Sequence, residues 1–158
     1  MIILGIDPGT SRIGYGVIEK SNGKLIYLDA GLINIPSTQK TEKLMALEKN
    51  LGDLIDKFKP DLIGVEKIFF SNNQKTAIAV AEARGVILNT IAKKSILLAE
   101  FTPPEVKKAV TDDGRASKQA VAKMVNLFLN LETRKILDDV TDALAIAIAA
   151  SSRVIPQI

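Results

Sequence analysis

The sequence predicts an α/β fold, a five-stranded mixed sheet in the order 3-2-1-4-5 with helices on both faces. In the first 35 residues, apolar or alternating runs are separated by tight-turn residues, which is typical of strands joined as antiparallel hairpins. In the stretch that follows, helical patterns alternate with short apolar runs, which is typical of right-handed parallel crossovers. The fourth strand is expected beside the first, and this placement gives the strand order.

The first strand is expected within the first ten residues, Met1-Ile-Ile-Leu-Gly-Ile-Asp-Pro-Gly-Thr10. A short apolar run of this kind is typical of a central, buried strand. Pro8 favours an extended backbone at Asp7 and helps to stop the pairing, and Gly9 permits a turn with positive φ. Asp7 is therefore expected where the strand leaves the sheet. On this stretch alone, an aspartate that accepts hydrogen bonds from turn amides is the simpler interpretation.

Two further strands should follow as antiparallel neighbours. Residues 12–19 alternate in the manner of a strand, and the turn residues before them form a hairpin with the first strand. Ser21-Asn22-Gly23 is a strong turn signal. The third strand is expected over residues 24–35, with a bulge near residues 29–31.

The next helix and strand complete the first crossover. Residues 44–58 carry an apolar stripe at helical spacing, and Lys59-Pro60 ends the helix. Residues 61–66 form another short apolar run, which ends on the carboxylate of Glu66. Strands one and four then lie on either side of the point where the winding of the sheet reverses, which is where open α/β sheets bind ligands.

The helix expected over residues 75–93 has apolar residues on more than one face. One stripe can cover the sheet, and the rest needs a second partner, either a second subunit or another part of the same domain. Both explanations remain open from the residues alone. The remaining elements are expected as a strand at 96–101, a short helix that opens at residues 102–105, a polar loop at 111–116, and helices at 117–129 and 138–151.

The composition narrows the possible chemistry. A chain of 158 residues, 47% hydrophobic and 25% charged, suits one soluble domain that spans residues 1–158. The absence of cysteine and histidine excludes disulfides, thiol nucleophiles, zinc sites built from these ligands and Ser-His-Asp triads. Catalysis would have to use carboxylates, lysines, hydroxyls or a hard cation held by oxygen ligands.

Two more properties concern location and partners. The N-terminal apolar run has neither a basic segment before it nor a cleavage site after it, so it is not a signal peptide. No apolar run reaches the roughly 18 residues needed to span a bilayer, and a cytoplasmic protein without membrane contact is expected. The net charge of +3 is compatible with a polyanionic partner but indicates one only weakly.

Carboxylates from three parts of the chain are expected to meet. Asp7 and Glu66 end neighbouring parallel strands at the same edge of the sheet. The last helix opens with Asp138 and Asp139, and Asp142 lies on the same helical face as Asp139. An acidic first turn also suits the helix dipole without any function. The apolar run that follows indicates a buried helix, however, and the polar first turn of a buried helix should face a binding partner or other polar groups.

Carboxylates gathered in this way would repel one another and raise one another's pKa values, so a stable arrangement needs cations. Oxygen-only ligation matches Mg²⁺ or Mn²⁺ rather than zinc. Two such ions about 3.5–4 Å apart can clamp the attacking and leaving oxygens of a phosphoryl transfer, with water as the nucleophile. This chemistry needs no covalent enzyme intermediate, which fits a chain without cysteine and histidine.

Short motifs along nearly the whole chain are similar to those of a known protein family. They are Gly5-Ile-Asp-Pro-Gly-Thr10, Gly14-Tyr-Gly-Val17, Gly64-Val-Glu66 followed by Phe69, Ala83-Arg-Gly85, Pro104-Glu-Val-Lys107, Lys118 and Asp139-Val-Thr-Asp-Ala-Leu-Ala-Ile146. Each motif alone is a weak signal, but their order, spacing and combination are highly specific. In this combination the sequence resembles the RuvC family of Holliday junction resolvases, which have a ribonuclease H-like fold.

The resemblance implies a homodimer that cuts two strands of a four-way DNA junction symmetrically, in recombination and repair. The dimer would form through the helix at 75–93. The resemblance further implies two Mg²⁺ ions per active site, for which Mn²⁺ can substitute. A branch-migration helicase complex is also implied as a partner.

The family's metal-binding and catalytic acids fall on Asp7, Glu66, Asp139 and Asp142. The third position has an alternative, because Asp138 is also acidic and its spacing to Asp142 is equally helical. Asp139 is preferred because the family motif has two residues between its last two acids.

The family's basic positions near the scissile phosphate match Lys107 and Lys118. Their implied role is phosphate binding and stabilisation of charge in the transition state. Lys108, Arg115 and Lys123 could extend this basic track along the DNA. The alternative for lysines is a solvated helix face.

An aromatic pair follows Glu66 in a stretch with the composition of a loop. The resemblance implies that Phe69 stacks against unstacked junction bases, whereas Phe70 is expected in the core. Asn73 would contact DNA, or it would begin the next helix together with Asn72.

Three other classes compete with a resolvase. The segment Gly5-Ile-Asp-Pro-Gly-Thr10 also resembles the first phosphate hairpin of actin-like ATPases and sugar kinases, but those proteins carry two such domains and a second phosphate loop. A ribosomal-RNA-processing nuclease of the same fold is closer in chemistry, and the region of Lys107 and Lys118 and the final acidic pair favour the resolvase. A non-catalytic junction-binding module would not need its acids intact.

Overall fold

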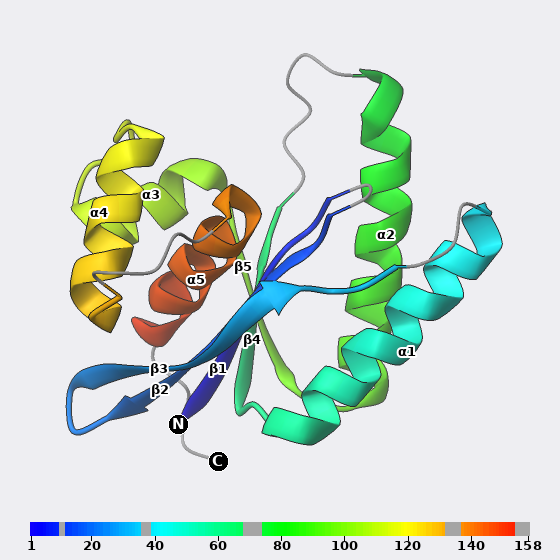
Figure 1. Cartoon of the computed structure of the whole chain (residues 1–158), viewed down its shortest axis with the longest axis horizontal. Helices are drawn as coiled ribbons and strands as arrows, with labels where there is room; N and C mark the ends of the chain where they lie inside the picture. Colours follow the sequence, from blue (N-terminus) through cyan, green and yellow to red (C-terminus); the bar gives the residue numbers. More distant parts are fainter. Residues whose placement is uncertain (10–11, 36–38, 68–73, 132–136, 154–158) are drawn as a thin grey trace.

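A five-stranded mixed sheet in the order β3-β2-β1-β4-β5 lies between two layers of helices, as the sequence predicts (Figure 1). The structure is a computed structural model and describes residues 1–9, 12–35, 39–67, 74–131 and 137–153. The strands are β1 (Ile2–Asp7), β2 (Gly14–Ser21), β3 (Lys24–Leu32), β4 (Leu62–Glu66) and β5 (Leu97–Phe101). The helices are α1 (Lys40–Phe58), α2 (Gln74–Lys93), α3 (Pro103–Thr111), α4 (Lys118–Leu129) and α5 (Asp138–Ser151).

The first three strands form the predicted antiparallel hairpins. Asn22 and Gly23 make the tight turn between β2 and β3, with φ angles of 50° and 78°. The predicted bulge lies at Leu28, just before the expected stretch, because the register shifts between the neighbouring β2 residues there. The third strand ends at Leu32 rather than at residue 35, since its last partner, Gly14, is where β2 begins.

The last two strands are parallel, as the two crossovers require. β1 pairs with β4 from Ile3–Leu62 to Ile6–Val65, and β4 pairs in turn with β5. Several helix boundaries differ from prediction by a few residues. α1 begins at Lys40, one turn before its apolar stripe, and α3 extends to Thr111 behind a capping box between Thr102 and Glu105.

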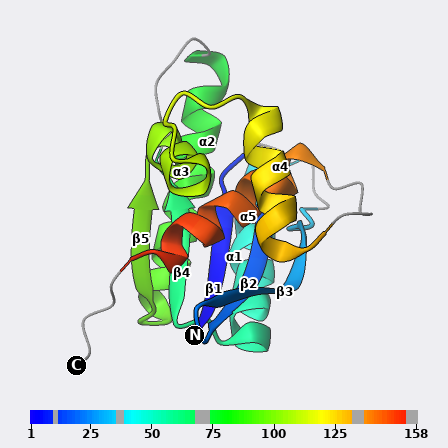
Figure 2. The ribbon, with the colours of Figure 1, turned by 90° about the vertical axis from the view of Figure 1, so that its left-hand side faces the viewer.

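A row of small residues crosses the middle of the sheet on the face that α5 covers (Figure 2). The register places Ala30, Gly16, Gly5, Gly64 and Ala99 side by side, one from each strand. A methyl group added to Gly5 would lie 2.1 Å from the carbonyl oxygen of Ala143 and 2.6 Å from the amide nitrogen of Ala147. The helix backbone therefore rests directly on the strand backbone, which only glycine allows at this position.

Two apolar cores lie on opposite faces of the sheet. On one face, α5 is the central element, and every residue from Ala143 to Ala150 is at most 5% exposed, with α3 and α4 packed around it (Figure 2). On the other face, α1 and α2 contribute a core that includes Leu51 and Ile87. The prediction of a mostly buried last helix is therefore confirmed.

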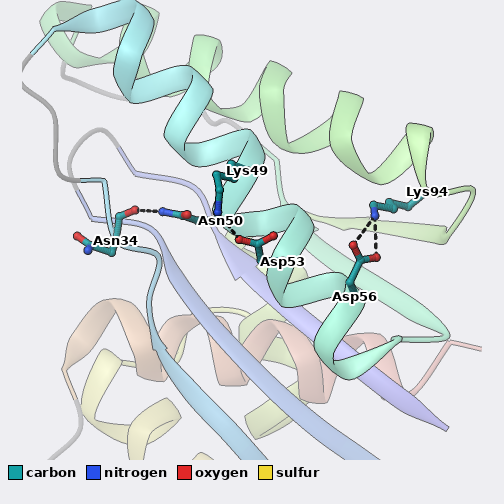
Figure 3. A network of polar contacts seen from close by, with 6 residues as sticks. All are labelled: Asn34, Lys49, Asn50, Asp53, Asp56 and Lys94. Carbon is teal, nitrogen blue, oxygen red and sulfur yellow. Dashed lines mark hydrogen bonds and ion pairs between the residues drawn. The ribbon is translucent and has the colours of Figure 1, made fainter.

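Polar contacts join α1 to its neighbours on the second face (Figure 3). The Lys94 ammonium at the end of α2 lies 2.6 Å from one carboxylate oxygen of Asp56, and the Asn50 side chain donates to the backbone oxygen of Asn34. On the outer side of α2, Ile78 is 70% exposed, so part of the apolar surface of this helix faces solvent. Within the described ranges, no helix combines the length and apolarity needed to cross a membrane.

Candidate active site

The carboxyl ends of β1 and β4 bring Asp7 and Glu66 to one edge of the sheet. The last β1–β4 pair is Ile6 with Val65, and each acid is the next residue of its strand. Side chains alternate along a strand, so Asp7 points to the same face as Gly5, and Glu66 to the same face as Gly64. That face carries α5, and both carboxylates are therefore directed toward this helix.

The first turn of α5 lies directly above the same edge. A methyl group added to Gly14, which pairs with Asp7, would lie 2.0 Å from the carbonyl oxygen of Asp139. The close approach at Gly14 thus fixes where α5 begins. Asp142, one turn further along, is partly buried, as is Asp139, whereas Asp138 is exposed.

Electrostatics place Asp7, Glu66, Asp139 and Asp142 in one group, called the acidic cluster below. Burial is the main cause that raises the pKa of Asp7 from 3.8 to about 7, and the charge of Glu66 adds to it, followed by those of Asp142 and Asp139. Burial, and then the charge of Asp142, raises the pKa of Glu66 from 4.5 to about 7. Asp138 is not among the charges that act on either group, and the geometry thus favours Asp139 as the member of the cluster.

The acidic cluster offers only oxygen ligands, which fit Mg²⁺ or Mn²⁺. As the side chains stand, no three acidic residues among those described lie close enough together to enclose one ion. The oxygen donors present nonetheless fit a hard cation in their chemistry, and the carboxylates would have to rotate toward one another to hold it.

Both predicted lysines lie beside the acidic cluster. The Lys118 ammonium at the start of α4 is 3.3 Å from a carboxylate oxygen of Asp142, and this carboxylate is the main cause that raises the pKa of Lys118. The positive charges of Lys118 and Lys107 both lower the pKa of Glu66. Lys108 and Arg115 are exposed and are not among the charges that act on the acids of the cluster.

Some predicted residues cannot be placed. Phe69 and Asn73, with their neighbours Phe70 and Asn72, lie outside the described residues. Conversely, the structure adds Arg84, whose guanidinium Nε donates a hydrogen bond to the backbone oxygen of Glu66. In the sequence, Arg84 stands out only as the centre of the motif Ala83-Arg-Gly85, and its local pattern predicts no contact with Glu66.

We expect the stability of the metal-free protein to fall as the pH rises from about 5 to about 8. The pKa values of Asp7 and Glu66 are raised to about 7 in the folded state, so the folded protein binds protons more tightly than the unfolded chain across this window. The resulting stabilisation is complete below the unfolded pKa values and is lost as the pH passes through 7. Because the chain has no histidine and no cysteine, few other groups titrate here.

Thermal unfolding in a chelating buffer, followed by circular dichroism at several pH values, checks this expectation. The melting temperature should decline toward pH 8, and the decline should be shallower in Asp7→Asn. A melting temperature that rises across the same window would show that these carboxylates are not destabilised by burial and repulsion.

Comparisons with known proteins identify the family of this chain. The family model described as "Crossover junction endodeoxyribonuclease RuvC" matches residues 3–150. The RuvC protein of Brachyspira hyodysenteriae is 46% identical over 154 residues, which cover 97% of this chain and 95% of the relative. That of Halothermothrix orenii is 45% identical over 149 residues, which cover 94% of this chain and 90% of the relative.

A solved structure gives the same result. "T. thermophilus RuvC in complex with Holliday junction substrate" matches with a TM-score of 0.87 and 29% identity, and the match covers 96% of this chain and 93% of that one. The fold is ribonuclease H-like, with the strand order predicted from the sequence. Through the match of the family model and of these relatives over nearly its full length, the chain belongs to the RuvC family of crossover junction endodeoxyribonucleases.

Proposed function

We propose that this protein resolves four-way DNA junctions by hydrolysing one phosphodiester bond in each of two strands, in recombination and repair. The observation that carries the proposal is the acidic cluster at the switch point of the sheet, in a chain that belongs to the RuvC family. Open α/β sheets bind their ligands at this edge. A relative with the same fold has been solved with a Holliday junction substrate bound.

The acidic cluster is proposed to hold Mg²⁺, with two ions per active site and Mn²⁺ as a substitute. When bound, the cations supply an activated water and offset charge on the reacting phosphate. The acids themselves position the ions: Asp7 and Glu66 from rigid strand ends, Asp139 and Asp142 from a buried helix. The pKa values near 7 support this role, because two carboxylates that repel each other gain most from a neighbouring cation.

The lysines are proposed to bind the scissile phosphate and to stabilise the charge that develops on it. Lys118 pairs with Asp142 in the absence of substrate. With a phosphate in the site, this ammonium would bind one of its oxygens in place of the Asp142 carboxylate. Lys107 on α3 lies near enough to lower the pKa of Glu66, and it would add a second positive charge.

Lys118→Ala should lower the rate of junction cleavage about a hundredfold and weaken junction binding only a few-fold, because it removes one stabilising charge from the transition state. Single-turnover cleavage and gel-shift titration measure the two effects. Lys49→Ala is a matched control, since Lys49 is an exposed cation on α1 that pairs only with Asp53 among its described contacts (Figure 3). Equal cleavage rates in the two variants would contradict the role of Lys118.

A homodimer is proposed, with α2 at the interface. Two symmetric cuts require two active sites, and the exposed Ile78 provides apolar surface on the outer side of this helix. Ile78→Glu should shift the protein from dimer to monomer in sedimentation at micromolar concentration. Met45→Glu is the matched control, because Met45 on α1 is equally exposed at 70%. A wild-type protein that sediments only as a monomer would contradict the proposal.

The remaining DNA contacts are proposed from the family alone. Phe69 would stack against bases at the junction centre, and Asn73 would contact the DNA nearby. Lys108 and Arg115 would extend the basic track along the arms, and both are exposed, as such a role requires. A branch-migration helicase complex is the proposed protein partner.

The decisive experiment compares a mobile four-way junction with a linear duplex of the same sequence, with Mg²⁺ and with a chelator. Paired nicks in the junction only, and only with Mg²⁺, are expected. Equal cutting of the duplex would contradict junction selectivity, and cutting in the chelator would contradict the metal. Preferred cutting of structured RNA, or hydrolysis of ATP, would favour the competing classes of nuclease and ATPase.

A further inference from the structure

Arg84 connects α2 to the end of the strand that carries Glu66. Its side chain is only 18% exposed, on a helix whose neighbouring residues Ala83 and Ile87 are buried against the sheet. The guanidinium makes two contacts. Its Nε lies 3.3 Å from the backbone oxygen of Glu66, and its terminal nitrogen forms an ion pair with the carboxylate of Glu100 on β5.

The two contacts hold the backbone of Glu66 and leave its carboxylate unobstructed. Glu100 pairs in register with Val65, so both point to the face of α2, while the side chain of Glu66 points to the opposite face, toward α5. Arg84 therefore reaches Glu66 from behind. It is not among the charges that act on the pKa of the Glu66 carboxyl, which agrees with this arrangement.

Regular strand pairing stops at this point of the sheet. The β1–β4 ladder ends at Ile6–Val65, and the residue after Asp7 is Pro8, which has no amide hydrogen to donate. On the other side, the Lys67 amide donates to the Phe101 oxygen at 2.7 Å. The hydrogen bond from Arg84 thus holds the Glu66 carbonyl at a position where β1 no longer pairs with β4.

We propose that Arg84 is a positioning residue for Glu66: the guanidinium, anchored by Glu100, sets the direction in which the Glu66 carboxylate meets the cation. This inference rests on the proposed function, in which Glu66 is a metal ligand. Groups that orient a metal ligand from behind commonly change metal affinity or activity by about 10- to 100-fold when they are removed. The planar fork of arginine can serve both acceptors at once, which a lysine ammonium cannot do in the same geometry.

The alternative is an ion pair that only stabilises the fold. Glu100 is 35% exposed, and partly exposed pairs contribute little to stability. A stabilising pair also has no need of the second contact to the backbone of Glu66. The two explanations differ in what they predict for the metal.

The test compares Arg84→Gln, Arg84→Lys and Glu100→Gln with the wild-type protein. Isothermal titration with Mn²⁺ measures metal affinity without DNA, and junction cleavage gives the Mg²⁺ concentration for half-maximal rate. Arg84→Gln should weaken Mn²⁺ binding and raise the half-maximal Mg²⁺ concentration about tenfold. Arg84→Lys should recover part of this loss, and Glu100→Gln should show a smaller change of the same sign.

Lys93→Gln is the matched control. Lys93 is a cation at the far end of the same helix, and its ammonium lies 2.6 Å from a carboxylate oxygen of Glu48. This variant also breaks an ion pair of α2, and it should leave both metal readouts unchanged. Melting temperatures of all variants, measured in chelator, separate the loss of stability from the loss of metal affinity.

The inference is overturned if Arg84→Gln lowers the melting temperature but binds Mn²⁺ within twofold of the wild-type affinity. If Arg84→Gln does not fold, Arg84→Lys and Glu100→Gln carry the test, and wild-type metal affinity in both overturns the inference. Failure of the proposed function has a different signature. In that case the wild-type protein itself neither binds Mn²⁺ nor cuts junctions in Mg²⁺.

Discussion

Asp7→Asn should lower the rate of junction cleavage by about a hundredfold to a thousandfold and leave junction binding within a few-fold of wild type. Asp7 projects from the central strand toward the first turn of α5, and the charges of the other three acids act on it. The asparagine is nearly the same size, so the fold and the DNA-binding surface should persist. Cleavage of a mobile junction in Mg²⁺ and gel-shift titration in Ca²⁺ measure the two properties.

The same variant should be more stable than the wild-type protein in chelator at pH 8. Burial and like charges raise the pKa of Asp7 to about 7, so the ionised carboxylate destabilises the metal-free fold, and the neutral amide removes that effect. A gain of about 1–3 kcal/mol in the free energy of unfolding is expected. Opposite effects on activity and stability exclude misfolding as the cause of inactivity. A variant that cuts at the wild-type rate would refute the assignment of Asp7.

Gly5→Ala should destabilise the protein by roughly 3 kcal/mol or more, because the added methyl group would overlap the backbone of α5. The new carbon would lie 2.1 Å from the Ala143 oxygen and 2.6 Å from the Ala147 nitrogen, and both atoms belong to helix backbone that cannot rotate away. The helix would have to rise from the sheet as a unit. Urea unfolding monitored by circular dichroism measures the loss.

Gly52→Ala is the matched control for this substitution. Gly52 lies inside α1, and apart from its chain neighbours and the backbone of its own helix, a methyl group there would meet no atom within 4 Å. Because alanine is a better helix former, a gain of about 0.4–1 kcal/mol is expected. If both variants changed stability by the same amount, close backbone contact at Gly5 would not be the reason for its glycine.

The strand order and the placement of Asp7 and Glu66 were predictable because the sequence marks where β1 and β4 end. Asp7 is followed by Pro8 and Gly9, and Glu66 closes an apolar run after a clear helix, so the topology alone brings the two acids to one edge. The identity of the third acid was less certain. Helical spacing allows Asp138 or Asp139, and only how α5 lies over the sheet makes Asp139 the residue whose charge acts on Asp7.

Other features depend on contacts that a sequence does not display. Arg84 and Glu100 lie on different elements, and nothing in the local pattern indicates that one guanidinium contacts both Glu100 and the Glu66 backbone. The ion pair between Lys118 and Asp142 is likewise not visible in the local sequence pattern, because the two residues are 24 positions apart and lie on different helices. The end of β3 at Leu32 likewise depends on where its neighbour β2 begins, not on its own composition.

The row of small residues under α5 has a consequence for how the protein loses activity on heating. At Gly5 and Gly14 the helix meets the sheet through backbone atoms, which cannot change rotamer to loosen the contact gradually. Amide hydrogens of α5 should exchange with solvent only when the whole domain opens. The acids carried by α5 are therefore part of the most protected unit of the fold, and heat should remove the active site and the fold in a single cooperative transition.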